Sequence, residues 1–580
     1  MASPDRMTRW RRLPPLFGAS IVSVILSSAS VHAQPPFSDP TGRSGEPPPL
    51  QRETPRPPPP TPILPPLPPP SPSEPRILGA RVFVREIRVV GSTVFSAEEL
   101  AKVVAPYVNR EVTSEDLETV RVALTRLYVD NGYVNSGAIL PDQTVADGVV
   151  TFEIIEGRVS DIAIEGNRWF RSDYLRRRLS LAAGPPLNIN PLQRKLQLLL
   201  EDPRFARINA ELKPGVLLGD SELHVLVEER LPYKLWLDFN NYQSPSVGAE
   251  RGIIGVEHQN LTGNGDILTL RYGRSEGLDP LLDFRYAVPV TAWDTTLSLQ
   301  YRRNTLNVVE EPFQDLEIES KTEIYTLGVR QPLYRTLNTE LAVEFVGERL
   351  SNETELLGEP FSLSPGARKG KMVVTAFRAA QEWVYRTQDQ VIAARSRFSV
   401  GLDAMGATIH RDEREPDGRF FAWLGQFQWV RRLPLLAAYV IFRTDVQLAD
   451  DALLALEQIS VGGRYSVRGY RENTLLTDNA VIASLELRAP VVRNVPWADY
   501  LELAPFFDFG RGWNHRGTLL GPQELYSIGI GLRWALTFLR PFPLRPQLEV
   551  YWGHRLREVP TSNGNLQDKG VHLQFLVTAF

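Results

Sequence analysis

The stretch Gly462-Gly463-Arg464-Tyr465-Ser466-Val467-Arg468-Gly469-Tyr470 is the one around which the rest of the chain can be interpreted. It lies in a long, mostly polar segment between two segments with a strand-like pattern. Its glycines allow positive φ and close approach of backbones, and Arg468 carries a planar fork of donors that matches a carboxylate. The stretch predicts a loop with a fixed tip. The alternative is an ordinary glycine-rich surface loop, and the surrounding sequence must decide.

Apolar and polar residues alternate in many short stretches of residues 232–580, as in Tyr233, Leu235, Leu237 and Phe239. Strands that are apolar on one face and charged on the other are typical of a membrane β-barrel with a wet interior. A soluble sandwich also alternates, but some 350 residues of such hairpins in an exported chain favour the barrel. Sixteen strands are predicted: 233–242, 249–259, 265–274, 281–289, 294–303, 321–330, 339–350, 371–386, 390–404, 417–430, 437–447, 478–489, 500–510, 525–536, 543–554 and 570–580.

Long and short connections alternate between these strands. Segments 304–320 and 449–478 are long and polar, whereas 289–293 and 387–390 are short. All long loops therefore lie on one side of the barrel. The first strand begins and the last strand ends on the other side, which faces the periplasm, as outer-membrane barrels require. The opening stretch falls in the long loop 448–477. The chain ends in Phe580, as many exported barrels do, although Phe580 is out of phase with the apolar residues Val571, Leu573, Phe575, Val577 and Ala579.

Residues 1–33 have the pattern of a secretory signal peptide. Four arginines between residues 6 and 12 precede a short apolar run, and Val31-His32-Ala33 supplies the small residues of a cleavage site after Ala33. The apolar run is interrupted by serines and is shorter than the ~20 residues of a membrane anchor. The sequence therefore predicts an exported chain.

Residues 34–75 form a proline-rich linker, because 19 of the 41 residues from 35 to 75 are proline. Such a composition favours extended polyproline segments over a packed core. We interpret the segment as a tether, with a proline-rich ligand for a partner protein as the alternative.

Residues 76–157 and 158–231 are predicted to form two tandem α+β modules with the element order β-α-α-β-β. In the first, a strand at 82–90 precedes two helices, which begin at the capping sequences Ser96-Ala97-Glu98-Glu99 and Thr113-Ser114-Glu115-Asp116. Strands near 134–140 and 149–155 follow. The second module repeats this order, with helices near 172–181 and 191–200. Small modules with exposed strand edges suit the binding of a peptide as an added strand.

The first module resembles the first POTRA domain of two-partner secretion transporters, of the haemolysin/haemagglutinin secretion-activation type. The resemblance lies in Gly132-Tyr133-Val134-Asn135-Ser136-Gly137-Ala138-Ile139-Leu140-Pro141-Asp142-Gln143 and in Gly148 to Gly157. The second module resembles the following POTRA domain, but Glu201-Asp202-Pro203-Arg204-Phe205 stands where the family usually has an Asn-Asp-Leu-Pro-Gly-like turn. The implied fold is two periplasmic α+β POTRA domains followed by a 16-stranded antiparallel transmembrane β-barrel.

The same resemblance assigns a role to the opening stretch. Val467-Arg468-Gly469-Tyr470 matches the Val-Arg-Gly-Tyr/Phe tip of a loop that folds back into the pore in this superfamily. Phe506-Phe507-Asp508-Phe509-Gly510 matches the family's partner motif on the barrel wall. The resemblance implies that Arg468 pairs with Asp508, with Phe507 and Gly510 beside it. The alternative is that this pair only stabilises the barrel and has no part in transport.

The composition argues against several classes of function. A net charge of −4 gives no basic excess for nucleic acid. The chain has no cysteine, and its seven histidines lack metal-ligand spacing, so no catalytic residue, metal site or cofactor is predicted. Gly273-Arg274-Ser275-Glu276-Gly277 fits a hydrolase motif, but that motif requires a strand-to-helix elbow. Here it joins two alternating strands, which predicts a hairpin turn.

The resemblance implies a protein of the outer membrane that captures an unfolded exoprotein in the periplasm and conducts it to the cell surface without nucleotide hydrolysis. The implied partners are a secreted, large β-helical exoprotein, outer-membrane lipid and, during biogenesis, the barrel assembly machinery. The alternatives are an assembly factor that inserts other barrels and a passive pore. Family transporters often carry an N-terminal helix that plugs the barrel. Segment 35–75 has no helical periodicity, so we expect the inward loop to close the pore.

Overall fold

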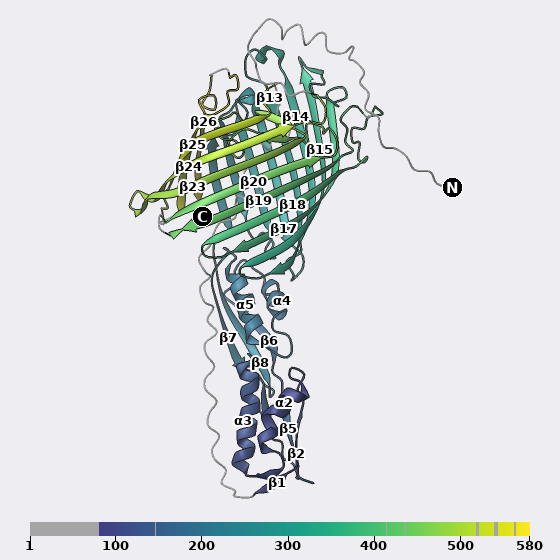
Figure 1. Cartoon of the computed structure of the whole chain (residues 1–580), viewed down its shortest axis with the longest axis vertical. Coiled ribbons are helices and arrows are strands. Elements are labelled where there is room, and N and C mark those ends of the chain that lie inside the picture. The colour runs from purple at the N-terminus through teal and green to yellow at the C-terminus, as the bar shows by residue number, and fades with distance from the viewer. Residues whose placement is uncertain are drawn as a thin grey trace, which may run out of the picture.

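The structure is a computed structural model that describes residues 81–145, 147–412, 414–434, 437–517, 521–538, 543–561 and 564–579. Two α+β modules follow one another along the long axis and lead to a β-barrel (Figure 1). The predicted signal peptide at 1–33, the proline-rich linker at 34–75 and the terminal Phe580 lie outside the described residues.

The first module packs two helices against a small sheet. Its three-stranded sheet has the order β2-β5-β4, with β2 parallel to β5, and β1 pairs with β3 in a second sheet. Both predicted capping boxes are present, because Ser96 and Glu99, and Thr113 and Asp116, cap each other's backbone N–H groups. The elements are β1 (Val82–Val84), β2 (Glu86–Val90), α2 (Ala97–Val104), η2 (Ala105–Tyr107), β3 (Arg110–Val112), α3 (Ser114–Asp130), β4 (Gly137–Ile139) and β5 (Val149–Ile155).

One strand was predicted at 82–90, and the structure corrects this. The chain breaks at Arg85, so that Val82–Val84 pairs with β3 and Glu86–Val90 pairs with β5. The side chains of Val84 and Ile87 both point into the module's core. The alternation changes phase at the break, from the even positions 82 and 84 to the odd positions 87 and 89, and a single continuous strand does not account for this change.

The second module repeats the helix-on-sheet arrangement, with the sheet order β6-β8-β7. Its core contains the helix residues Leu175, Leu179, Leu192 and Leu196, which recur at the spacing of one helix face. Its elements are β6 (Arg158–Glu165), α4 (Ser172–Ser180), α5 (Ile189–Leu200), β7 (Phe205–Pro214) and β8 (Asp220–Glu229).

The signature segment of the first module lies at the junction between the two modules. The amide of Ile189 donates to the carbonyl of Gly132 at 2.9 Å, and Asn135 Nδ2 donates to Ser221 Oγ at 3.1 Å. A Cβ at Gly132 would lie 2.7 Å from the Asn188 side chain. Gly132 and Asn135 therefore hold the modules in one relative orientation.

The predicted sixteen-stranded antiparallel barrel is confirmed. It closes by pairing of its first strand with its last, β9 with β27. A short strand, β16 (Glu359–Pro360), only extends the hairpin after β15. The sixteen are β9 (Tyr233–Asn240), β10 (Arg251–His258), β11 (Ile267–Ser275), β12 (Leu278–Pro289), β13 (Thr296–Asn307), β14 (Glu319–Arg335), β15 (Thr339–Leu356), β17 (Lys371–Arg386), β18 (Gln390–Gly401), β19 (Phe421–Leu433), β20 (Ala438–Ala449), β23 (Asn479–Val495), β24 (Ala498–Trp513), β25 (Glu524–Ala535), β26 (Leu544–Arg555) and β27 (Val571–Ala579).

Several strands run past their predicted ends. The strand predicted at 478–489 extends to Val495, and the one predicted at 417–430 is Phe421–Leu433. Beyond the bilayer both faces of a strand meet water, so the alternation that marks a strand in the sequence is lost there. The hydrolase-like string is a hairpin turn as predicted, because β11 ends at Ser275 and β12 begins at Leu278.

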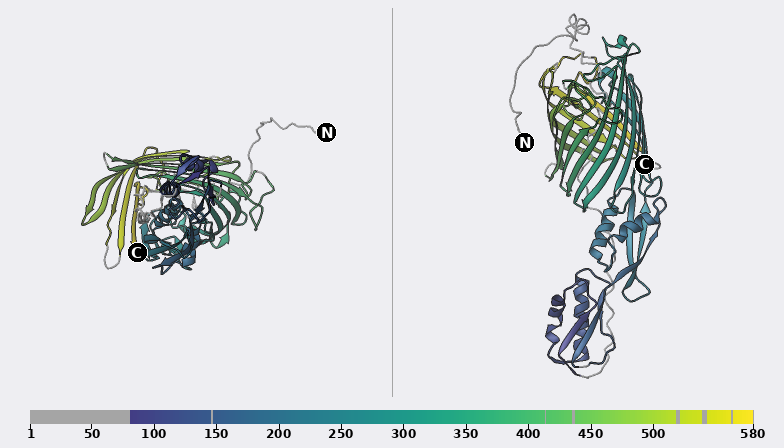
Figure 2. Two further views of the ribbon diagram at one scale, coloured as in Figure 1. Left: turned by 90° about the horizontal axis from the view of Figure 1, so that it is seen from below. Right: turned by 90° about the vertical axis from the view of Figure 1, so that its right-hand side faces the viewer.

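The predicted inside and outside of the barrel are also confirmed. Leu237 and Phe239 on β9 are exposed on the outer face, whereas Asn240, on the same strand, is buried toward the lumen. On β24 the alternation is equally sharp, with Phe507 44% exposed and Asp508 fully buried. The long connections lie at the end of the barrel away from the modules, and the short turns face them (Figures 1 and 2). Among the described residues, no helix is long and apolar enough to cross a membrane.

Candidate functional site

The loop between β20 and β23 folds into the barrel. It contains a short hairpin of β21 (Ile459–Val461) and β22 (Leu475–Thr477), whose tip carries the glycine-rich stretch. Polar loops normally lie on the surface, yet Val461, Val467 and Tyr470 are no more than 1% exposed. We call residues 450–478 the inward loop.

Arg468 is the centre of the inward loop's attachment to the wall. Its Nε donates to Asp508 Oδ2 at 2.7 Å and its Nη2 to Asp508 Oδ1 at 2.8 Å, so the pair is bidentate. The Arg468 backbone N–H also donates to Asp508 Oδ2, at 3.0 Å. Nη1 donates to Glu486 on β23, and Nη2 donates to Ser484 Oγ at 3.0 Å. The guanidinium carbon lies 3.6 Å from the ring centroid of Phe506. One buried cation is therefore held by two carboxylates and a ring.

Glycines let the tip approach the wall backbone. Gly469 has φ +89°, and a Cβ on Gly553 of β26 would lie 2.8 Å from its Cα. A Cβ on Gly510 would lie 2.4 Å from Val461 Cγ1 and 2.7 Å from Val467 Cγ2. These separations leave no room for a side chain at Gly510 or Gly553. The glycine of the predicted partner motif thus serves to pack the loop.

Further residues of the tip attach to β25, β26 and the loop after β26. The Tyr470 hydroxyl lies 2.9 Å from the Tyr526 carbonyl oxygen and 2.8 Å from that of Arg557. Arg464 Nη2 donates to Glu549 Oε2 at 2.7 Å. Arg471 pairs with Asp568 and, at 2.9 Å, with Glu310 in the loop after β13. The tip is therefore attached to several walls of the lumen.

The first half of the inward loop has a separate anchor. Glu457 accepts hydrogen bonds from Arg378 on β17, at 2.7 and 2.9 Å. Arg378 also donates to Glu348 at 2.9 Å, so it too lies between two carboxylates. The loop thus spans the lumen from β17 to β24, fixed by buried ion pairs at both ends.

The structure brings together Arg468, Asp508 and Gly510 of the predicted site, with Val467, Gly469 and Tyr470 packed beside them. It does not bring Phe507 there. Phe507 points outward, and its neighbour Phe506 lies beneath the guanidinium. The expectation for Phe507 is corrected, because adjacent residues of a strand face opposite sides.

Sequence reasoning missed Glu486 as a partner of Arg468. In the sequence, Ser484 and Glu486 alternate with Leu485 and Leu487, so a signal that both face the lumen was present. Pairing them with the loop required the register of β23 against β24, in which Ser484 lies opposite Asp508.

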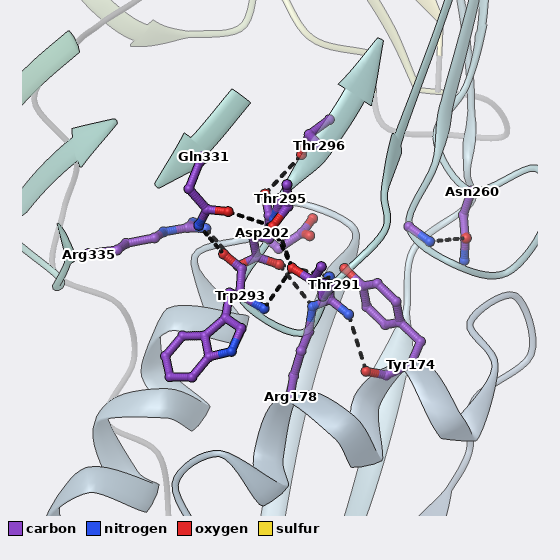
Figure 3. A network of polar contacts seen from close by, with 12 residues as sticks. Tyr174, Arg178, Asp202, Asn260, Thr291, Trp293, Thr295, Thr296, Gln331 and Arg335 are labelled. Atoms are coloured by element: carbon purple, nitrogen blue, oxygen red, sulfur yellow. Dashed lines mark hydrogen bonds and ion pairs between the residues drawn. The ribbon is translucent and has the colours of Figure 1, made fainter. Parts of the chain in front are cut away.

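The second module is joined to the barrel by a polar network (Figure 3). Arg178 on α4 stacks on Tyr174, with 3.6 Å between its guanidinium carbon and the ring centroid. It also donates to Asp294 Oδ1 at 2.8 Å, in the turn between β12 and β13. Arg204 Nη1 donates to the carbonyls of Gln259 and Gly265 at 2.8 Å each. Arg204 belongs to the segment where the sequence departs from the family, and that segment binds the module to the turn between β10 and β11.

Comparison with known proteins identifies this architecture. Residues 219–534 match the profile of the haemolysin secretion/activation proteins ShlB/FhaC/HecB, and residues 82–157 match the ShlB-type POTRA domain. The chain belongs to the ShlB/FhaC/HecB family. It is a two-partner secretion transporter of the outer membrane, with a POTRA domain ahead of its barrel.

Relatives of this ShlB-type chain carry transporter names. The outer membrane transporter CdiB of Dickeya dadantii is 23% identical over 79% of this chain and 81% of its own. The haem/haemopexin transporter protein HuxB of Haemophilus influenzae 86-028NP is 21% identical over 76% and 78%. The haemolysin transporter protein ShlB of Serratia marcescens is 22% identical over 73% and 77%. These names are transporter names and not enzyme names.

Solved structures share the fold. CdiB from Escherichia coli superposes with a TM-score of 0.64 at 20% identity, covering 87% of this chain and 92% of its own. BamA from Haemophilus ducreyi lacking POTRA domains 1–3 superposes with a TM-score of 0.51 at 15% identity, covering 86% and 99%. Both likenesses show the fold alone.

Proposed function

We propose that this ShlB-type chain captures an unfolded exoprotein in the periplasm and conducts it through the barrel to the cell surface, without nucleotide hydrolysis. The observation that carries the proposal is the inward loop, which crosses a closed sixteen-stranded barrel and is held by Arg468, Asp508 and Glu486. A buried loop attached by specific ion pairs has two definable states, docked and released. Release would open the lumen.

Capture is assigned to the modules. The second module, residues 158–231, is proposed as a second POTRA domain because it repeats the order and helix-on-sheet packing of the first. Among the described strands, none pairs with the outer edge of β7, which is ten residues long. A free edge of this length can accept an extended chain as an added strand.

The remaining assignments belong to the same proposal. Residues 1–33 direct export, residues 34–75 tether the modules, and residues 232–580 form the membrane domain. The exoprotein is proposed to be a large β-helical protein that folds outside the cell, so that folding supplies the direction of transport. Outer-membrane lipid surrounds the barrel, and the barrel assembly machinery inserts it.

Co-expression with a secreted β-helical protein encoded beside this chain tests the proposal. We expect the exoprotein in the medium when the chain is present and in the periplasm when it is deleted. Secretion that is equal without the chain contradicts transport. Loss of many unrelated barrels on deletion supports the alternative, an assembly factor.

A further inference from the structure

A cavity of about 560 Å³ lies between the second module and the periplasmic mouth of the barrel. Helices α4 and α5 form one side, and the ends of β11 to β14 with their turns form the other. Arg330, which lines it, is paired with Glu340 at 2.6 Å and with Glu382 at 2.9 Å, across β15 and β17. The cavity therefore lies at the entrance of the lumen.

The lining of this cavity carries an excess of positive charge. Two of its side chains are acidic, Asp202 and Asp294. Six are basic: Arg178, Arg194, Lys195, Arg204, Arg330 and Arg335. Four of the basic residues are paired, Arg178 and Arg335 with Asp294, Arg204 with Asp202, and Arg330 with Glu340 and Glu382.

Arg194 and Lys195 on α5 differ from the other four. Within the described part of the chain, neither makes a hydrogen bond or an ion pair, although both line the cavity. Lys195 is partly buried, and burial lowers its pKa. The negative charge of Asp294 opposes this shift, and the positive charges of Arg178 and Arg335 add to it. Asp294 is already paired with both of those arginines, so a further carboxylate bound beside Lys195 would stabilise this partly buried cation.

Large apolar side chains face the same space. Trp293 is 67% exposed and Leu333 60% exposed, both at the barrel rim, and Leu181 at the end of α4 is 40% exposed. Figure 3 shows Trp293 beside the polar network that joins the module to the rim. A polypeptide segment that carries both carboxylates and apolar side chains would complement these cations and the exposed apolar groups beside them.

We propose that this cavity is an entry site that binds an acidic, apolar segment of the unfolded polypeptide as it passes from the second module into the lumen. The proposal rests on the proposed function, since it names a feature of the substrate. Its place explains why the module is held to the rim by Arg178 and Arg204. A polypeptide released from the edge of β7 would meet this surface before the inward loop.

The test uses the full chain in phosphatidylcholine nanodiscs. The probe is a fluorescently labelled, unfolded peptide of Glu, Asp, Leu, Ser and Gly, and a second peptide has Lys in place of Glu and Asp. We expect anisotropy to report binding of the acidic peptide alone, weakening as salt is raised. The double variant Arg194→Gln/Lys195→Gln should bind the acidic peptide about five- to tenfold more weakly, as expected for two partly exposed charge pairs.

The matched control is Arg168→Gln/Arg177→Gln, which removes two exposed cations of the same module that do not line the cavity. It should bind like the parent chain. A photo-reactive residue at Leu333 should cross-link to the acidic peptide, and one at Val122, which is 48% exposed on α3 of the first module, should not.

Three results overturn the proposal. One is equal binding by the parent and the Arg194→Gln/Lys195→Gln variant, and another is equal cross-linking from Val122 and Leu333. The third concerns phosphatidylglycerol. If the parent chain retains this lipid and the variant alone loses it, while peptide binding is unchanged, the cavity is a lipid site. Failure here is distinguishable from failure of the proposed function, because secretion would still require the chain.

Discussion

Arg468 of the inward loop is shared between Asp508 on β24 and Glu486 on β23, and all three side chains are no more than 1% exposed. Removal of the cation is costly, because it leaves the buried Asp508 without its ion-pair partner and Glu486 with Arg488 alone. Breaking a buried pair costs about 3–5 kcal/mol. Arg468→Ala should therefore release the tip, raising the open probability of the purified protein in planar bilayers. Unchanged conductance would show that the rest of the loop suffices to close the lumen.

The shared arginine changes what a charge swap should do. In Arg468→Asp/Asp508→Arg, the new aspartate would lie beside Glu486, so the swap restores one pair and creates one repulsion. We expect partial rescue of closure, and better rescue when Glu486→Gln is added. Full rescue by the swap alone would mean that Glu486 does not act on the loop tip.

The close approach of Gly469 and Gly553 can be tested by adding a side chain at Gly553. Gly553→Val would place a side chain where the Gly469 backbone lies, and the loop must then move away. We expect increased conductance with the barrel still folded, as judged by its heat-modifiable migration on gels. Gly347→Val is the control, because a Cβ at Gly347 meets nothing within 4 Å. Equal effects of the two substitutions would contradict a docking role for Gly553.

The contacts of Arg178 should restrict local opening at the junction between the second module and the barrel. Arg178→Gln removes its pairing with Asp294 and its stacking on Tyr174. Hydrogen exchange should become faster in α4 and in the turn between β12 and β13, whereas Arg177→Gln, on the same helix with its side chain 74% exposed, should leave both unchanged. Unaltered exchange in the Arg178 variant would show that Arg204 alone holds the junction.

The hydrogen bonds of Glu156 should make the stability of the first module depend on pH. Burial raises the pKa of this carboxyl, but hydrogen bonds from Thr93, Val94 and Tyr128 outweigh that effect and hold its pKa below the usual range. Because the folded pKa is lowered, the stabilisation is present above the unfolded pKa of about 4.3 and is lost as pH falls through the folded value. Hydrogen exchange in α3 should therefore show stability falling below about pH 4.3. Glu156→Gln should lower that stability at neutral pH and weaken its fall, and an identical pH profile would contradict this assignment.

The sequence predicts local and periodic features of this chain well. Alternation in stretches such as 233–240 correctly predicted the barrel, its strand number and its inward face, because that pattern depends only on which face meets lipid. The capping boxes at Ser96 and Thr113 gave the starts of both helices of the first module. Each of these signals lies within a few neighbouring residues.

Features that depend on tertiary registration were not predictable in this way. Glu486 becomes a partner of Arg468 only through the pairing of β23 with β24, and Phe506 replaces Phe507 because of which face of β24 is inside. Arg178 lies on a helix whose pattern is explained by its own module, so its pairing with Asp294, 116 residues away, left no mark in the sequence.

A disulfide lock tests the central claim most directly, and the absence of native cysteine makes it specific. A Cβ at Gly510 would lie 2.7 Å from Val467 Cγ2, and Val461→Ala removes the methyl group that this Cβ would otherwise meet. The variant Val461→Ala/Val467→Cys/Gly510→Cys should therefore join the loop to the wall. We predict that the oxidised variant conducts no current and secretes no exoprotein, and that reduction restores both, with each single-cysteine variant insensitive to oxidant. Secretion at the parent rate while the lock is closed would contradict the claim that the inward loop must leave the wall for the chain to pass.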